Sequence, residues 1–214
     1  NYSAPANQTS TVNITAKSVS VSWGTLTWEY NNTARSTTYS ATGVSGETIN
    51  LAVTSGTNSI TNAGTQAVTV GCNTVTGGRA KCSNYSLTNT SKTLTVTKKA
   101  ITGGAPSSCT NREYNGGRNI TCSHASYSGQ ISGTSVTITP TCTTADADVG
   151  TGKTVTCSYA SNNSNYSAPA NQTSTVNITA KSIAVSWGGT TSWQYDKTAH
   201  STGSVTASTG VTNE

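Results

Sequence analysis

Six cysteines are the residues of this sequence best suited to chemistry, and their spacing indicates which chemistry that is. Their number is even, and they show neither the Cys-x-x-Cys spacing of redox enzymes nor the clustered short-spaced pairs of structural zinc sites. Such an arrangement favours structural disulfides, which persist in oxidising compartments. We therefore expect an extracellular or cell-surface protein whose cysteines bind no metal.

Neighbouring cysteines bracket turns of the chain. The intervening turns contain Gly77-Gly78, Gly116-Gly117 and Gly150-Thr151-Gly152. Cysteines on either side of a hairpin turn can be joined as cross-strand bridges. The alternative for the last four cysteines is Cys109–Cys157 with Cys122–Cys142, but that pairing does not close each hairpin on itself. The expected bridges are Cys72–Cys82, Cys109–Cys122 and Cys142–Cys157.

Two histidines and seven acidic residues accompany the cysteines. A catalytic triad needs a histidine beside a nucleophile and an orienting acid, but His124 and His200 belong to different parts of the chain. His200 is expected in a solvated turn. Asp146 and Asp148 have calcium-binding chemistry, yet a calcium site takes six to eight oxygens, and two carboxylates in a turn are typical of a solvated loop. We expect no enzyme activity and no catalytic, cofactor-binding or metal-binding residue.

Other polar residues also have structural interpretations. Lys17, Lys99 and Lys181 have isopeptide chemistry, but no strand pattern pairs them with a buried Asn and Glu, so we interpret them as junction residues. Eleven asparagines stand in Asn-x-Ser/Thr, a pattern that permits glycosylation without requiring it. The net charge of +5 comes from scattered basic residues, which does not favour nucleic-acid binding. No apolar run approaches the ~20 residues of a membrane-spanning helix.

The sequence repeats itself. Residues 1–24 read NYSAPANQTSTVNITAKSVSVSWG, and residues 165–188 differ from them only at Val19/Ile183 and Ser20/Ala184. A weaker repeat lies at half that distance, because TLTVTKK at 93–99 matches TVNITAK at 11–17 and at 175–181. The elementary module is therefore about 82 residues long.

Module boundaries follow from this repeat. We expect residues 1–17 to be the closing strand of a preceding module, and residues 182–214 to be the opening part of a third. Two complete modules lie between them, at 18–99 and 100–181. The two end segments together are too short to complete one module between neighbouring molecules by strand donation, so a longer tandem array is the preferred interpretation.

Strict alternation of apolar and polar residues indicates β-strands. Val12 and Ile14 share one face of their segment, and Leu94 and Val96 share one face of theirs. Gly- and Asn-rich breaks separate the strand-like segments, and no stretch shows a helical period. Short strands in a module of about 80 residues predict an all-β fold of tandem immunoglobulin-like β-sandwich modules, stapled by disulfides.

A family resemblance rests on the segments WEYNNTARSTTYSATGVSGETINL, NAGTQAVTV and NYSLTNTSKTLTVTKKAIT (28–51, 62–70 and 84–102). They resemble the bacterial immunoglobulin-like repeats of the MBG or YDG type, found in large surface proteins and adhesins. The sequence departs from the pattern at Gly116-Gly117-Arg118, where Thr-Ala is usual, and in its cysteines. The resemblance implies strand and turn positions more than it implies a ligand.

These observations favour a structural repeat region, a stalk, spacer or filament, of a secreted or cell-surface bacterial protein. The expected partners are neighbouring repeats and identical chains in a filament. The alternative is an adhesin module that binds a glycan or host surface protein, with Trp28 and Trp193 as candidate contacts. Five other aromatic residues recur with the repeat, as core anchors should: Trp23, Trp187, Tyr30, Tyr114 and Tyr195.

Overall fold

The structure is a computed structural model that describes residues 1–78 and 81–212. In these residues the regular elements are strands, apart from one short 3-10 turn, η1 (Cys82–Asn84). The expectation of an all-β protein is confirmed. No helix in the described part of the chain is long and apolar enough to cross a membrane.

The chain divides into two compact units. The first contains residues 1–99, 131–134 and 164–166, and the second contains residues 100–130, 135–163 and 167–214.

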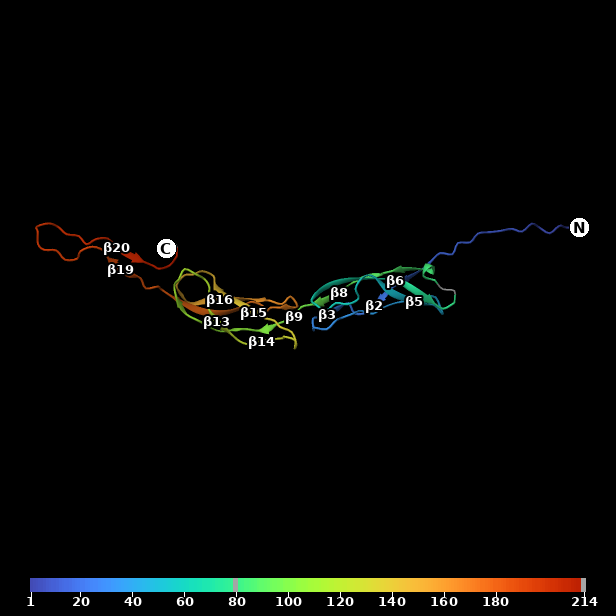
Figure 1. Cartoon of the computed structure of the whole chain (residues 1–214), viewed down its shortest axis with the longest axis horizontal. Coiled ribbons are helices and arrows are strands. Elements are labelled where there is room, and N and C mark those ends of the chain that lie inside the picture. The colour runs from blue at the N-terminus through green and yellow to red at the C-terminus, as the bar shows by residue number, and fades with distance from the viewer. Residues whose placement is uncertain (79–80, 213–214) are drawn as a thin grey trace. The chain divides into compact units, whose positions relative to one another are not determined.

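The first unit contains a six-stranded sheet in the order β2-β4-β5-β6-β8-β3. Figure 1 labels β2, β3, β5, β6 and β8 of this sheet. Neighbouring strands in the β2-to-β8 run are antiparallel, whereas β3 at the edge is parallel to β8. The strands are β2 (Ser22–Trp23), β3 (Thr27–Glu29), β4 (Tyr39–Thr42), β5 (Thr48–Gly56), β6 (Gly64–Thr76) and β8 (Ser91–Thr97).

Alternation decides which face of these strands is buried. In β8, Leu94 and Val96 are buried, while Thr93 and Thr97 are exposed. Leu94 has no exposed surface at all. Burying a side chain of this size stabilises the folded chain by about 1.5–3 kcal/mol relative to leaving it exposed. This gain explains why β8 turns its Leu94 and Val96 face towards the core.

The first unit also contains a separate parallel pair of strands. β1 (Lys17–Ser20) runs beside β7 (Tyr85–Thr88), with Val19 opposite Leu87. Val19, Ile49 and Tyr85 are buried together there. A further short pair joins β9 (Lys99–Ala100) to β17 (Tyr166–Ser167).

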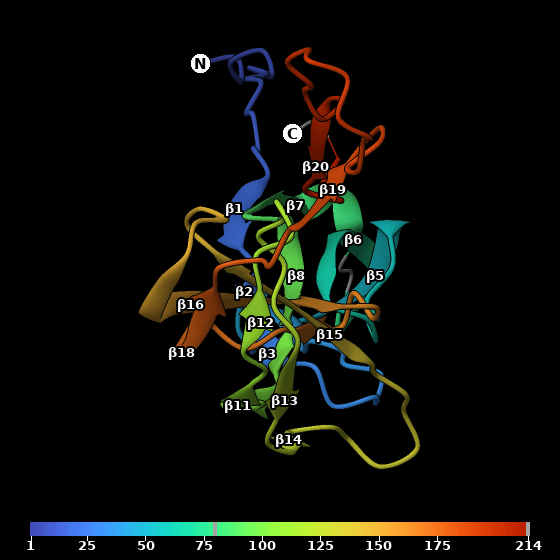
Figure 2. The same ribbon diagram turned by 90° about the vertical axis from the view of Figure 1, so that its left-hand side faces the viewer.

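The second unit contains a four-stranded sheet in the order β12-β18-β16-β15. β12 is parallel to β18, and the other pairs are antiparallel. Two short antiparallel pairs accompany the sheet, β11 with β13 and β10 with β14. Figure 2 labels β11, β13 and β14. The strands are β10 (Thr102–Gly103), β11 (Pro106–Cys109), β12 (Arg112–Glu113), β13 (Cys122–His124), β14 (Tyr127–Ser128), β15 (Ile138–Thr144), β16 (Gly150–Ser161) and β18 (Gln172–Thr179).

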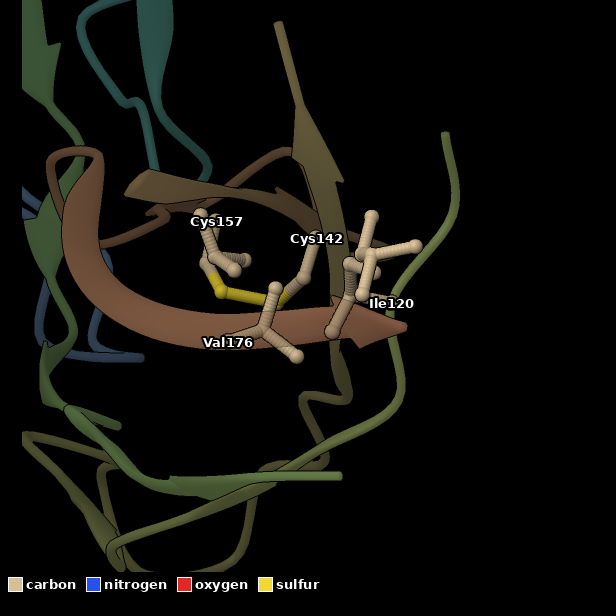
Figure 3. Close-up of a cluster of buried hydrophobic side chains, with 6 residues drawn as sticks. Ile120, Cys142, Cys157 and Val176 are labelled. Atoms are coloured by element: carbon tan, nitrogen blue, oxygen red, sulfur yellow. A yellow bond between two sulfur atoms is a disulfide. The ribbon is translucent and has the colours of Figure 1, made fainter. Parts of the chain in front are cut away.

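A disulfide lies in the middle of the core of the second unit. The sulfur atoms of Cys142 and Cys157 join β15 to β16, and Val176 of β18 and Ile120 lie beside them (Figure 3). Val155 and Ile178 complete the buried cluster.

The two terminal segments are less embedded. Residues 1–16 form no strand, and Val12 and Ile14 are 84% and 95% exposed. Residues 11–16 are thus not in a strand, although the identical heptapeptide at 175–181 provides most of β18. The difference is physical, because β18 has β16 and β12 as hydrogen-bonding partners, whereas residues 11–16 pair with no strand in the described part of the chain. The expectation that residues 1–17 close a preceding module stays a prediction.

The segment 182–212 contains one hairpin. β19 (Ala184–Trp187) pairs antiparallel with β20 (Val205–Ser208). Val185 and Trp187 remain 51% and 64% exposed. A lone two-stranded hairpin has no second layer on which to bury such a face.

Candidate functional site

The structure contains three disulfides, and they are the pairs that the cysteine spacing predicts. Cys109 lies directly opposite Cys122 across β11 and β13, and Cys142 lies directly opposite Cys157 across β15 and β16. Cross-strand neighbours at such positions are close enough to be bridged. The alternative pairing of these four cysteines is not formed. The bridges are Cys72–Cys82, Cys109–Cys122 and Cys142–Cys157.

The two disulfides of the second unit lie against one another. The Sγ atoms of Cys122, Cys142 and Cys157 all lie within 4.8 Å of each other. His124 belongs to the same cluster, because its Nε2 is 3.6 Å from the Sγ of Cys142. Its ring also meets Tyr159 edge-on, with 5.8 Å between ring centroids. Metal ions bind cysteine as the thiolate, but these sulfurs are oxidised to disulfides. The chemistry that the arrangement favours is therefore thiol–disulfide exchange.

The spacing of the cysteines in the sequence does not predict that the two disulfides and His124 lie together. His124 is two residues from Cys122, and this spacing does not show which other cysteines lie near it. The closeness to Cys142 and Cys157 arises because the segment just before β13 lies beside β15. Asn119 forms an antiparallel bridge with Thr143, and Ile120 N–H donates to Cys142 O over 2.9 Å.

Asn-Tyr-Ser occurs at Asn1, Asn84 and Asn165, and the tyrosines of the second and third copies anchor loops, whereas Tyr2 is fully exposed. The hydroxyl of Tyr85 accepts a hydrogen bond from Val44 N–H at 3.0 Å and donates one to the carboxylate of Glu47. The bond to Glu47 raises the pKa of Tyr85. The hydroxyl of Tyr166 likewise accepts from Ile131 N–H at 3.1 Å. The recurrence of Asn-Tyr-Ser in the sequence marks equivalent positions, but it does not show which loop each hydroxyl reaches.

Two of the tyrosines expected as core anchors hold equivalent places. Tyr30 is 4% exposed, and Tyr114 is half-buried against the core of the second unit. Tyr195 departs from the expectation, since it is 89% exposed. Tyr195 belongs to no strand in the described part of the chain, whereas Tyr30 N–H donates to Thr97 O of β8 at 2.8 Å.

The aromatic contact candidates are divided between the interior and the surface. Trp23 and Trp28 are half-buried, and the Nε1–H of Trp23 donates to Asn89 O at 2.8 Å. Trp187 is 64% exposed, which differs from its expected role as a core anchor. Trp193 is 41% exposed and stacks on His200, with ring centroids 5.0 Å apart.

His200 lies in an exposed turn with Asp196 and Thr198. Its Nε2 is 2.9 Å from Asp196 Oδ1 and 3.4 Å from Thr198 Oγ1. A triad histidine uses one ring nitrogen for the nucleophile and the other for the acid, but both contacts here are made by Nε2. The pKa of Asp196 is lowered, chiefly because Thr198 Oγ1 donates to its carboxylate. The arrangement is that of a hydrogen-bonded turn.

The remaining charged candidates form exposed pairs. The ammonium of Lys153 binds the carboxylate of Asp146 and lowers its pKa, and Asp148 N–H donates to the same carboxylate at 2.9 Å. Lys99 Nζ lies 2.8 Å from Glu29 Oε2. Lys153 therefore supplies the positive charge at the turn that contains Asp146 and Asp148.

Residues 92–176 match the family model described as YDG domain, which supports a YDG-type domain in this part of the chain. The match runs from β8 to β18 and includes both adjacent disulfides of the second unit. No curated protein and no solved structure matches the chain.

Proposed function

We propose that this chain is part of a stalk, spacer or filament of a secreted or cell-surface bacterial protein, built from tandem immunoglobulin-like modules. The observation that carries the proposal is one strand arrangement that recurs with the sequence repeat. In the first unit β3 is parallel to β8, and Tyr30 N–H donates to Thr97 O at 2.8 Å. In the second unit β12 is parallel to β18, and Tyr114 N–H donates to Thr179 O, also at 2.8 Å.

The proposed module boundary near Lys99 has independent support. The contact pattern divides the main chain between Lys99 and Ala100. The first strand of the unit begins at Lys17, the equivalent lysine of the preceding repeat. Modules joined at a single lysine have almost no linker, which favours a stiff array over independently tumbling domains.

The disulfides support an extracellular setting and a mechanical role. Each one closes a short loop, with sequence separations of 10, 13 and 15 residues. Cross-links of this kind restrict the unfolded chain and limit how far a module can be extended. Small secreted domains use them where the hydrophobic core alone is modest.

The proposed partners are neighbouring repeats and, in a filament, identical chains. β3 and β15 each end a sheet, and edge strands are where lateral association begins. We propose no enzymatic role, since the acids and histidine of the exposed turns bind one another in the pairs described above.

Small-angle scattering on the chain tests the proposal. Two modules with strands of ordinary length, joined end to end, should advance the chain by roughly 70–80 Å. A rod of that length supports the spacer. A compact particle with modules folded back on each other would contradict it.

The adhesin alternative has one observation in its favour, the exposed Trp193 stacked on His200, which is the kind of flat aromatic surface that sugars bind. Glycan-array screening separates the two functions. Nanomolar binding of a defined glycan, abolished by Trp193→Ala or Trp28→Ala without unfolding, would favour the adhesin.

A further inference from the structure

The two adjacent disulfides of the second unit differ in access to solvent. Cys142 and Cys157 are 6% and 0% exposed, whereas Cys109 and Cys122 are only partly buried. Thiol–disulfide exchange requires a thiolate to reach a disulfide sulfur. A soluble thiol therefore meets Cys109–Cys122 before it meets the buried bridge.

Release of Cys122 would place a new nucleophile beside the buried bridge. Its Sγ lies within 4.8 Å of both Cys142 and Cys157 Sγ. The attack is then intramolecular, and orientation of this kind is worth many orders of magnitude over a collision in solution. Small side-chain rotations suffice to bring two sulfurs at this distance into contact.

The two sulfurs of the buried bridge are not equivalent as leaving groups. Cys142 Sγ has the Nε2 of His124 at 3.6 Å, and an imidazole N–H can donate to a thiolate. Cys157 lies in an apolar cluster with Val155, Val176 and Ile178. Exchange is faster when the leaving thiolate is the better stabilised one, which selects Cys142 as the leaving group and Cys157 as the sulfur attacked.

We propose that Cys109, Cys122, Cys142 and Cys157 form a thiol–disulfide exchange site. A soluble dithiol reduces the outer bridge, Cys109–Cys122, and the thiolate that is released then exchanges with the buried bridge, Cys142–Cys157. The dithiol attacks Cys109 Sγ, and Cys122 leaves as a thiolate. The second thiol of the reagent then releases Cys109 and closes the reagent into a cyclic disulfide, so two electrons pass to the protein. Cys122 next forms a bond with Cys157, the Cys142–Cys157 bond breaks, and Cys142 leaves as a thiolate with His124 as hydrogen-bond donor. The last step is an isomerisation without net oxidation.

A pH jump on the wild-type chain tests the exchange. A water-soluble phosphine at about pH 4 reduces disulfides while thiols stay protonated and exchange is slow. The species with Cys109–Cys122 reduced is isolated, raised to about pH 8, quenched in acid, alkylated and mapped. The label is expected to move from Cys122 to Cys142. The species with Cys72–Cys82 reduced is the control, and its labels are expected to stay on Cys72 and Cys82.

Variants in which one cysteine is replaced by serine test the same step without a reductant. Cys109→Ser leaves one thiol, which is expected to appear on Cys142, whereas Cys82→Ser leaves a thiol that is expected to remain on Cys72. His124→Leu is expected to slow label transfer to Cys142 by roughly tenfold, the effect of one hydrogen bond to a charged group. A label that stays on Cys122 overturns the proposal, and a label on Cys157 in place of Cys142 overturns the assigned direction. Because the pH jump uses the wild-type chain, the test does not depend on the folding of any variant.

Discussion

Ile14 and Ile178 stand at the same place in two identical heptapeptides, residues 11–17 and 175–181, but in opposite surroundings. Ile14 is 95% exposed, whereas Ile178 is 1% exposed and belongs to the buried cluster of the second unit. Substituting alanine for either isoleucine removes the same three carbon atoms from the same local sequence. Any difference in stability between the two variants therefore measures the tertiary environment alone.

The expected magnitudes differ widely. Ile→Ala removes three carbon groups, and at about 0.8 kcal/mol for each buried group the transfer contribution is roughly 2.4 kcal/mol. The cavity left in the core adds to this, so Ile178→Ala should destabilise the second unit by about 2–5 kcal/mol. Ile14→Ala should stay within about 0.5 kcal/mol of the wild type.

Native-state amide hydrogen exchange followed by mass spectrometry is the appropriate assay. A chain with two units is not expected to unfold in a single two-state transition, and exchange reports each unit separately. Peptides from β16 and β18 should lose protection by roughly 30-fold or more in Ile178→Ala, while peptides from β5 and β6 keep theirs. An equal loss in Ile14→Ala, or a loss below about fivefold in Ile178→Ala, would refute the burial argument.

Three further predictions concern cross-links, ionisation and backbone conformation. Replacing both Cys142 and Cys157 by alanine opens a bridge with a sequence separation of 15 and should cost about 3 kcal/mol in denaturant unfolding; an unchanged midpoint would contradict this. The pKa of Tyr85 is raised in the folded chain by its hydrogen bond to Glu47, so its stabilising contribution is complete below the unfolded pKa of about 10 and is lost as pH rises through the folded pKa. Glu47→Gln should lower that pKa in a spectrophotometric titration, and no change would exclude Glu47 as the cause. Asn89 has φ of 55° and donates from Nδ2 to a backbone oxygen at 2.8 Å, so Asn89→Ala should lose about 1 kcal/mol more than Asn89→Gly in thermal unfolding.

Much of the secondary structure was predictable because alternation and turn signals are local. Leu94 and Val96 face the core of the first unit, as their period of two requires. The disulfides were predictable for a related reason, since each joins the two sides of a nearby turn. The mutual contact of two disulfides was not predictable, because alternation shows which face of a strand is buried and not which strand lies across from it.

The repeat predicted equivalent positions, but equivalence in sequence did not produce equivalence in structure everywhere. Tyr30 and Tyr114 occupy matching places beside a closing strand, while Tyr195 stays exposed. Residues 11–16 of the first heptapeptide similarly form no strand, although their copy forms part of β18. A strand obtains its hydrogen bonds from its neighbours, so identical residues give a strand only where those neighbours are present.

The parallel pairing of β3 with β8 determines how the first unit would respond to tension. β3 lies near the start of the unit and β8 near its end, with Thr27, Trp28 and Glu29 aligned with Thr95, Val96 and Thr97. Force applied at the two ends of the unit would drag these strands along their own length in opposite directions. Their hydrogen bonds would then be loaded in shear and would have to rupture together, whereas an antiparallel hairpin pulled from its open end unzips one bond at a time.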